Sequence, residues 1–300
     1  MTLQPASHWE LRPVRCPICE AEDARFLGYR GGWAHHRRSG IASPIVECTA
    51  CKLVYPSPTP FPRDHSHYDS PAEYFAGDHF GQAKIDEVVG ILGRAKDLGG
   101  GSAGSMLDIG CGCGESLRAA QLAGWNAVGV EPSKEFVDTG RREFGVSTQH
   151  GFVEDAGLPD ESFDLVMLSG VLEHVYNPLE LLREARRLVK AEGLVYIDVP
   201  NERGLYHRVG RIYFRMRRRD WCLALSPTFP PYHVVGFSPR SMRVALERAR
   251  MRAVSLRTYP IEFSSQPGIP PLMAAVSDLV ERAASCMNSA AGLVVWAKPA

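Results

Sequence analysis

The sequence predicts an α/β fold, a doubly wound Rossmann-like sheet preceded by a small cysteine-rich module. Three observations lead to this prediction: apolar runs alternate with amphipathic helical patterns from residue 105 onward, a glycine loop follows the first run, and four paired cysteines lie within the first sixty residues. Such alternation is typical of a parallel sheet covered on both faces. We expect three parts, at 1–62, 63–104 and 105–300, the last containing insertions at 201–236 and 260–290.

Length and composition describe an ordinary globular protein. The 300 residues are 45% hydrophobic and the formal net charge is zero, so only a local patch could attract nucleic acid or an anionic membrane. The sequence contains neither a basic-then-apolar leader nor a run of 18 apolar residues. We therefore expect a cytoplasmic protein that has no membrane partner.

The first part contains the paired cysteines and ends in the proline-rich segment YPSPTPFP at 55–62. In a reducing compartment C-x-x-C pairs are more often metal ligands than disulfides, and four thiolates make a closed zinc site with no position for water. Disulfides stay an alternative, and His35 and His36 between the pairs are either further ligands or exposed turn residues. We expect a structural zinc ion bound by Cys16, Cys19, Cys48 and Cys51.

The second part holds one helical pattern, QAKIDEVVGILGRAKDLGGG, which ends at the glycine cluster 99–104. It also contains the aromatic stretch HYDSPAEYF. Tyr68 and Tyr74 in this stretch either form a lid over a ligand or pack the linker onto the core.

The third part repeats a strand followed by a helix. The strands MLDIG, NAVGVEP, FDLVMLSG and GLVYIDVP alternate with the helices ESLRAAQLAG, KEFVDTGRREFG and PLELLREARRLVKAEG. After an arginine-rich insertion the pattern resumes with the helix SPRSMRVALERARM and the strand AVSLRTYP, and the last strand is GLVVWAKP.

The loop after the first strand contains Gly110, Gly112 and Gly114, where an open parallel sheet binds its ligands. A P-loop needs Gly-Lys-Ser/Thr, but Glu115 and Ser116 follow here. A dinucleotide site needs its third glycine at position 115, where a glutamate would repel phosphate. Asp108 and Glu115 instead favour a cationic ligand.

The next loops complete a nucleoside site. Glu131, followed by Pro132, lies about 20 residues beyond the glycine loop, where an acid accepts hydrogen bonds from ribose hydroxyls. Asp155 and Ala156 suit an adenine amine and ring, and Ser169 ends the fourth strand of the core. A nucleoside with a cationic tail is S-adenosylmethionine.

On these residues the sequence resembles the class I S-adenosylmethionine-dependent methyltransferases. The resemblance rests on MLDIGCGCG, GVEPS, EDAGLPDESFDLVMLSGVLEHV and LLREARRLVKAEGLVYIDVPN, and covers about residues 105 to 201. It implies a seven-stranded sheet whose last strand, GLVVWAKP, is antiparallel. With the cysteine module it is similar to a subgroup that contains sugar C-methyltransferases and other small-molecule enzymes.

Methylation of an alcohol, phenol or carbon acid needs a base near the cofactor. His174 in SGVLEHV, next to Glu173, is the first candidate. In the sugar C-methylating enzymes a tyrosine and a histidine before the next helix act with it, and Tyr232 and His233 match them. The family's acid between these two is missing. Each histidine could instead have only a structural role.

We expect methyl transfer to an oxygen or carbon of a small-molecule acceptor, such as a sugar or a natural-product intermediate. The alternatives are an RNA methyltransferase and a non-catalytic binding module. Neutral charge, and SGVL in place of an Asn-Pro-Pro-Tyr-like motif, argue against nucleic acid as a partner. The arginine run at 208–220 either binds an anionic group of the acceptor or is a solvated helix face.

Overall fold

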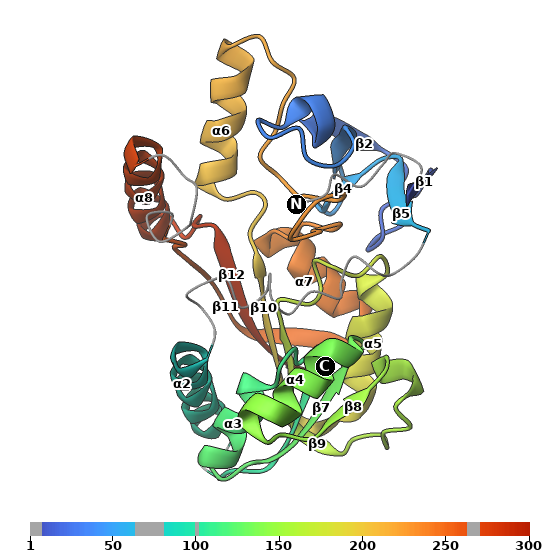
Figure 1. Cartoon of the computed structure of the whole chain (residues 1–300), viewed down its shortest axis with the longest axis vertical. Helices are drawn as coiled ribbons and strands as arrows, with labels where there is room; N and C mark the ends of the chain where they lie inside the picture. Colours follow the sequence, from blue (N-terminus) through green and yellow to red (C-terminus); the bar gives the residue numbers. More distant parts are fainter. Residues whose placement is uncertain (1–7, 64–80, 100–101, 263–270) are drawn as a thin grey trace.

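A seven-stranded sheet forms the centre of the computed structural model, which describes residues 8–63, 81–99, 102–262 and 271–300 (Figure 1). The strand order is β11-β12-β10-β9-β6-β7-β8. Only β12 runs antiparallel to its neighbours, so the predicted sheet with an antiparallel last strand is confirmed. The strands are β6 (Ser105–Ile109), β7 (Asn126–Glu131), β8 (Thr148–His150), β9 (Phe163–Ser169), β10 (Val189–Pro200), β11 (Met251–Tyr259) and β12 (Gly292–Pro299).

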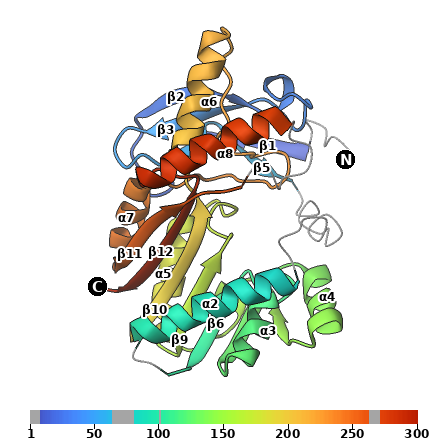
Figure 2. The same ribbon diagram turned by 90° about the vertical axis from the view of Figure 1, so that its left-hand side faces the viewer.

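Helices cover both faces of the sheet because successive strand residues point to opposite sides. Met106 packs with α2 (Gln82–Gly99) and α3 (Glu115–Leu122), whereas Leu107 packs with α5 (Pro178–Leu188) and α7 (Pro239–Arg248). The helix α4 (Lys134–Phe144) packs against β8. The helices α6 (Leu205–Met216) and α8 (Pro271–Cys286) stand beyond one end of the sheet (Figure 2).

Helix ends follow their local sequence signals. Ser133, Asn177 and Ser238 cap α4, α5 and α7 with their side-chain oxygens, and α2 ends at Gly99 as predicted. Two helices are shorter than their patterns indicated. The pattern SPRSMRVALERARM extended to Met251, but α7 ends at Arg248 and Met251 begins β11. The prediction extended α5 through VKAEG, but α5 ends at Leu188 and β10 begins at Val189, because Val189 pairs with Phe163 of β9.

The N-terminal module consists of two small sheets. β2 (Ala24–Arg30), β3 (Ser43–Cys48) and β4 (Val54–Pro56) form one, and β1 (Trp9–Arg12) pairs with β5 (Thr59–Pro62) in the other. A short 3-10 helix, η2, spans Gly32–Ala34.

This module is joined to the core by packing and by backbone hydrogen bonds. Val54 and Gly236 exchange two backbone hydrogen bonds, of 2.9 and 2.8 Å. Ile18 and Tyr55 lie in the same apolar cluster as Phe237 and Leu246. The segment that links module and core includes Tyr68 and Tyr74, which lie outside the described residues. No helix within the described ranges is long and apolar enough to cross a bilayer.

Candidate functional site

The glycine loop turns sharply between β6 and α3. Gly110, Gly112 and Gly114 have φ values of 70, 55 and 85°, a region that other residues rarely adopt. A Cβ on Gly110 would come within 2.8 Å of Val171, and one on Gly114 within 2.6 Å of Val146. Glycine is therefore required here, and the loop presents bare backbone at the carboxyl edge of the sheet.

Glu131 lies against this loop. Its Oε2 accepts a hydrogen bond from the backbone N–H of Gly112 and its Oε1 one from that of Ser133, both at 2.9 Å. The carboxylate is buried at the tip of β7. Pro132 is exposed, and its carbonyl oxygen is 3.0 Å from Nε2 of His150.

Two more acids lie at the same loop. Asp108 is buried on β6, and its carboxylate accepts a hydrogen bond from the hydroxyl of Ser116. Burial raises the pKa of Asp108 to about 7, and Ser116 and the charge of Lys84 on α2 offset part of that rise. Glu115 is also buried, and its Oε1 accepts no hydrogen bond from the described residues. The loop therefore suits a cationic ligand better than a phosphate.

The remaining predicted cofactor residues lie on the neighbouring loops. Asp155 ends the 3-10 helix η4 (Val153–Asp155) and is exposed. Ala156 is half-buried, and its carbonyl oxygen accepts a hydrogen bond of 3.0 Å from Gln149. Ser169 is half-buried at the end of β9.

The sequence analysis missed Asp198. It lies on β10 opposite Ser169 and accepts a hydrogen bond of 2.7 Å from the hydroxyl of Tyr259. Burial raises the pKa of Asp198 to about 6, and the positive charge of Lys84 offsets part of this rise. The sequence did contain a signal for this residue, an acid near the end of the apolar run LVYIDVP. Residues at the carboxyl ends of parallel strands face the edge of the sheet that binds ligands.

The four predicted acceptor-side residues come from two segments sixty residues apart. Glu173 and His174 follow β9, and the backbone carbonyl of Glu173 accepts hydrogen bonds from the N–H groups of Val234 and Val235, at 2.8 and 3.1 Å. These bonds bring the rings of His174 and His233 to 4.8 Å between centroids.

Tyr232 has a left-handed backbone with φ 64°. Its ring centroid is 6.4 Å from that of Trp9 in the N-terminal module. A residue of that module therefore lies beside one of the four predicted acceptor-side residues.

Burial determines the charge of the side chains of Glu173, His174 and His233. It lowers the pKa of His174 to about 3, with a further contribution from His233, and that of His233 to about 4, against the opposing charge of Glu202. Burial also raises the pKa of Glu173 to about 8, helped by Asp198 and Glu202. Both imidazoles are thus neutral near pH 7. Ligand atoms of Glu173, His174 and His233 lie within 4.8 Å of one another, close enough to share a metal ion.

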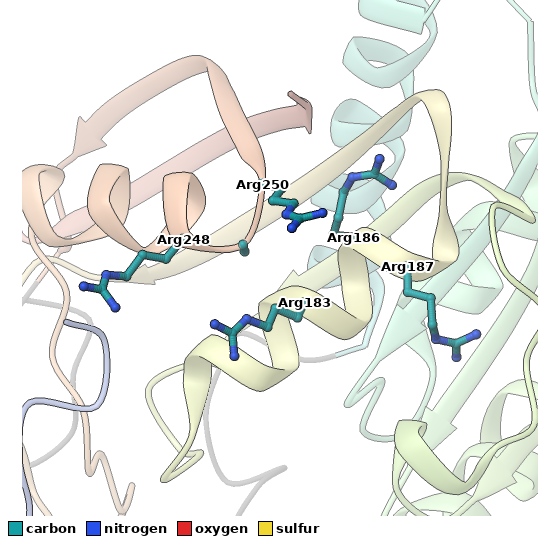
Figure 3. Close-up of a pocket in the computed structure, with 6 residues that line it drawn as sticks. Arg183, Arg186, Arg187, Arg248 and Arg250 are labelled. Carbon is teal, nitrogen blue, oxygen red and sulfur yellow. The ribbon is translucent and has the colours of Figure 1, made fainter. Parts of the chain in front are cut away.

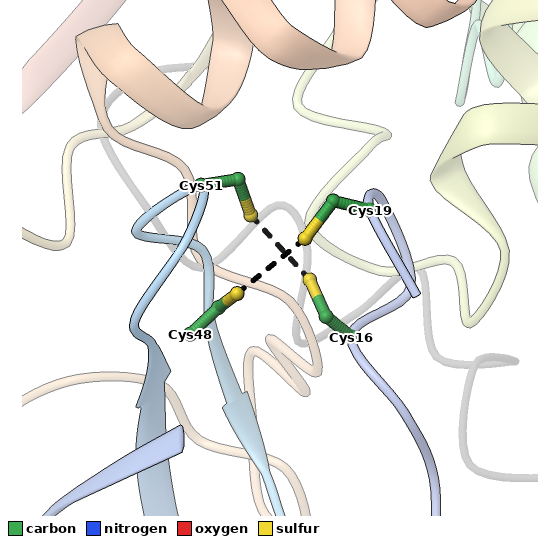
Figure 4. A group of neighbouring side chains, drawn as sticks. All are labelled: Cys16, Cys19, Cys48 and Cys51. Carbon is green, nitrogen blue, oxygen red and sulfur yellow. Dashed lines mark hydrogen bonds between the residues drawn. The ribbon is translucent and has the colours of Figure 1, made fainter. Parts of the chain in front are cut away.

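Four cysteine sulfur atoms converge in the N-terminal module (Figure 4). The Sγ atoms of Cys16 and Cys51 are 3.4 Å apart, those of Cys19 and Cys48 are 3.5 Å apart, and all four lie within 4.8 Å of one another. A disulfide requires about 2.05 Å, whereas sulfurs bound to one zinc ion at about 2.3 Å are separated by roughly 3.8 Å. The donor set fits zinc, and His35 and His36 do not belong to it.

The two C-x-x-C segments fold alike. The carbonyl of Cys16 accepts the N–H of Glu20 at 2.9 Å, and that of Cys48 accepts the N–H of Lys52 at 3.1 Å. Glu20 and Lys52 both have left-handed backbones, with φ of 61 and 70°. The same turn thus presents a pair of sulfurs from each segment to a common centre.

The arginine run divides between a pocket and the surface. Arg208 and Arg211 line a pocket of about 500 Å³ between the N-terminal module, α6 and the start of α7. Arg25 and Arg203 line it too, and both form ion pairs with Glu47, at 3.2 and 2.7 Å. The rest of the run, Arg215 and Arg217 to Arg219, is exposed.

The central part of the chain is similar in sequence to known methyltransferases. Residues 107–197 match a family model described as a methyltransferase domain. The ubiquinone biosynthesis O-methyltransferase of Actinobacillus pleuropneumoniae (serotype 7, strain AP76) is 28% identical over 106 residues, 32% of this chain and 45% of that protein. Its namesake from Pseudomonas aeruginosa (strain UCBPP-PA14) is 30% identical over 123 residues, 39% of this chain and 49% of that protein.

Among solved structures, a SAM-dependent methyltransferase from Archaeoglobus fulgidus has the same fold. The TM-score is 0.52 at 21% identity, and the match covers 75% of this chain and 99% of the other. The chain spans about half the length of the curated relatives it matches.

Proposed function

We propose that this chain is a class I S-adenosylmethionine-dependent methyltransferase that methylates an oxygen atom of a small-molecule acceptor; its methyltransferase domain and its fold support the proposal. The observation that carries the proposal is the pair of half-buried imidazoles of His174 and His233, whose ring centroids are 4.8 Å apart. They lie where β9 ends, and β9 is the direct neighbour of the strand that leads into the glycine loop. A proton acceptor is therefore present near the cofactor edge of the sheet.

The acids around the glycine loop would hold the cofactor. Asp108 and Glu115 supply negative charge near the sulfonium and amino groups, and Glu131 has lone pairs left for ribose hydroxyls after accepting two backbone N–H groups. Asp155 and Ala156 would border the adenine. Bound S-adenosylmethionine supplies a methyl group that is already activated for displacement.

The histidines would handle the proton that the acceptor loses. Methylation of an acceptor hydroxyl releases the proton of that hydroxyl, and a neutral imidazole would accept it. His174 is neutral because burial lowers its pKa, and the charge of Glu202 favours a proton on the neighbouring His233. We assign His174 as the first acceptor of the proton and His233 as its partner.

Two observations favour oxygen over carbon. The curated relatives that match the core are named O-methyltransferases. In addition, Tyr232 and His233 are adjacent, so the acid that separates them in sugar C-methyltransferases is missing.

The four cysteines would hold a structural zinc ion. Four thiolates leave no open position on the metal, so this ion would have no part in methyl transfer. It would fix the two C-x-x-C turns, and with them the module that carries Trp9 beside Tyr232.

Transfer of labelled methyl groups to a panel of hydroxylated small molecules tests the proposal. Once an acceptor is found, His174→Ala should lower kcat by about a hundredfold or more with unchanged cofactor affinity, because a general base contributes that much. The control is His36→Ala, an exposed histidine of the N-terminal module. Equal turnover by His174→Ala and the control, or transfer to RNA alone, would contradict the proposal.

A further inference from the structure

Two neighbouring helices expose apolar side chains that a folded protein normally buries. On α6, Val209, Ile212 and Met216 follow helical spacing, and Ile212 and Met216 are 59% and 80% exposed. No residue of α6 is buried. Its apolar stripe therefore points to solvent.

The helix α8 also exposes apolar side chains to solvent. Leu272, Val276 and Leu279 are spaced along one face, and Leu272 and Leu279 are 79% and 68% exposed. The buried residues of the helix are small or polar: Ala274, Ser277, Glu281 and Ala284. Glu281 is held in its buried position because its carboxylate accepts the backbone N–H of Ala291 at 2.8 Å.

The two helices stand side by side. They pack against each other, and the N–H of Leu205 at the start of α6 donates to the carbonyl of Ser289 just after α8, at 2.7 Å. Both project from the same end of the molecule (Figure 2). We call the stripes of Val209, Ile212 and Met216 and of Leu272, Val276 and Leu279 the α6–α8 surface.

Positive charge borders this surface. Six arginines lie between residues 208 and 219, and Arg208, Arg215 and Arg217 to Arg219 are exposed. No carboxylate of the described residues forms an ion pair with any of these five. Arg217 and Arg219 lie over the rings of Tyr213 and Trp221, at 5.8 and 4.5 Å from the centroids, so aromatic side chains lie among the charges.

Apolar side chains flanked by arginines and aromatic rings are the pattern of a helix that lies in a lipid interface. We propose that the α6–α8 surface binds the surface of an anionic bilayer, with the stripes among the acyl chains and the arginines at the phosphates. Neither helix is long and apolar enough to span a bilayer. The zero net charge of the whole chain conceals this local patch, and the proposal departs from the expectation, drawn from the sequence, of a protein with no membrane partner.

A second copy of the chain is a poorer occupant. A two-fold dimer through this surface would bring two copies of the arginine cluster together, and like charges in an interface oppose association. Nucleic acid would use the arginines but leave the apolar stripes in water. An anionic bilayer would contact both the arginines and the apolar stripes.

Flotation of the full-length, zinc-loaded protein with vesicles tests this. We expect binding to phosphatidylcholine vesicles containing about a third phosphatidylglycerol, weak binding to pure phosphatidylcholine, and loss of binding at high salt. The variant Ile212→Ser/Leu279→Ser keeps every charge and should lose most of the binding. The variant Arg217→Ala/Arg218→Ala/Arg219→Ala should weaken it by about fivefold for each arginine removed.

The chain offers a matched control in a second arginine cluster, which lines a pocket between the ends of α5 and α7 (Figure 3). The variant Arg183→Ala/Arg248→Ala/Arg250→Ala removes the same charge away from the apolar stripes and should bind vesicles like the unmodified protein. Thermal unfolding checks that all variants fold. Absence of binding to anionic vesicles, equal losses in control and test variants, or conversion of a dimer to monomers by Ile212→Ser/Leu279→Ser would overturn the proposal. Binding to duplex RNA in place of vesicles would overturn it too.

Discussion

Ionisation of Asp108 should control cofactor affinity. Burial raises the pKa of this carboxyl to about 7, so about half of the unliganded protein carries it protonated near neutrality. S-adenosylmethionine carries positive charge, so it should bind the ionised form preferentially and drive out a proton. Affinity should therefore rise with pH through the pKa of Asp108 and level off above about pH 8.

The expected size follows from the fraction ionised. At about pH 6 roughly one molecule in ten is ionised, so the dissociation constant should be about tenfold larger than its value at high pH. Calorimetric titrations in two buffers of different ionisation enthalpy would also count the proton, with nearly one released per cofactor bound at about pH 6.

The variant Asp108→Asn is the matched control, since it keeps the shape of the side chain but does not titrate. It should bind the cofactor more weakly, with no such pH dependence and no proton release. A flat affinity profile for the unmodified protein between about pH 6 and pH 8 would refute the reasoning, because the buried carboxyl would then not titrate where its burial implies.

Three further substitutions test the hydrogen bonds of the glycine loop, the packing of α4 against that loop, and the metal site. Glu131→Gln keeps one acceptor oxygen for two backbone N–H groups and should cost about 1–3 kcal/mol of stability in urea unfolding, as well as cofactor affinity. Gly140→Ala should cost a similar amount, because its Cβ would collide with the carbonyl of Cys113 in the glycine loop. The helical control Gly93→Ala meets nothing within 4 Å and should stabilise by about 0.5–1 kcal/mol; equal effects of the two alanines would contradict this. Cys51→Ser should abolish stoichiometric zinc, measured by mass spectrometry of the metal, and lower the unfolding temperature; unchanged metal content would exclude the four-cysteine site.

Local patterns accounted for much of the fold and of the cofactor loop. Short apolar runs between amphipathic helices predicted the strands of the central sheet, and the spacing of Gly110, Gly112 and Gly114 predicted a turn that only glycine permits. The position of Glu131 followed from strand length alone, because the carboxyl end of a parallel strand faces the ligand.

Features that depend on distant contacts were not visible in the sequence. Asp198 looked like one polar residue inside a strand until β10 was placed beside β9. The end of α5 at Leu188 follows from pairing of Val189 with β9, which overrides the helical pattern. The apolar stripes of α6 and α8 have ordinary amphipathic spacing, and only the structure shows that these stripes face outward.

Equilibrium binding of S-adenosylmethionine to the zinc-loaded protein, compared with its demethylated product, NAD and ATP, tests the central claim most directly. We predict micromolar binding of the first two at one per chain, lost in Glu131→Ala, and no measurable binding of the two phosphate-bearing ligands. Binding of NAD or ATP in preference, or binding of none of the four to demonstrably folded protein, would contradict the account.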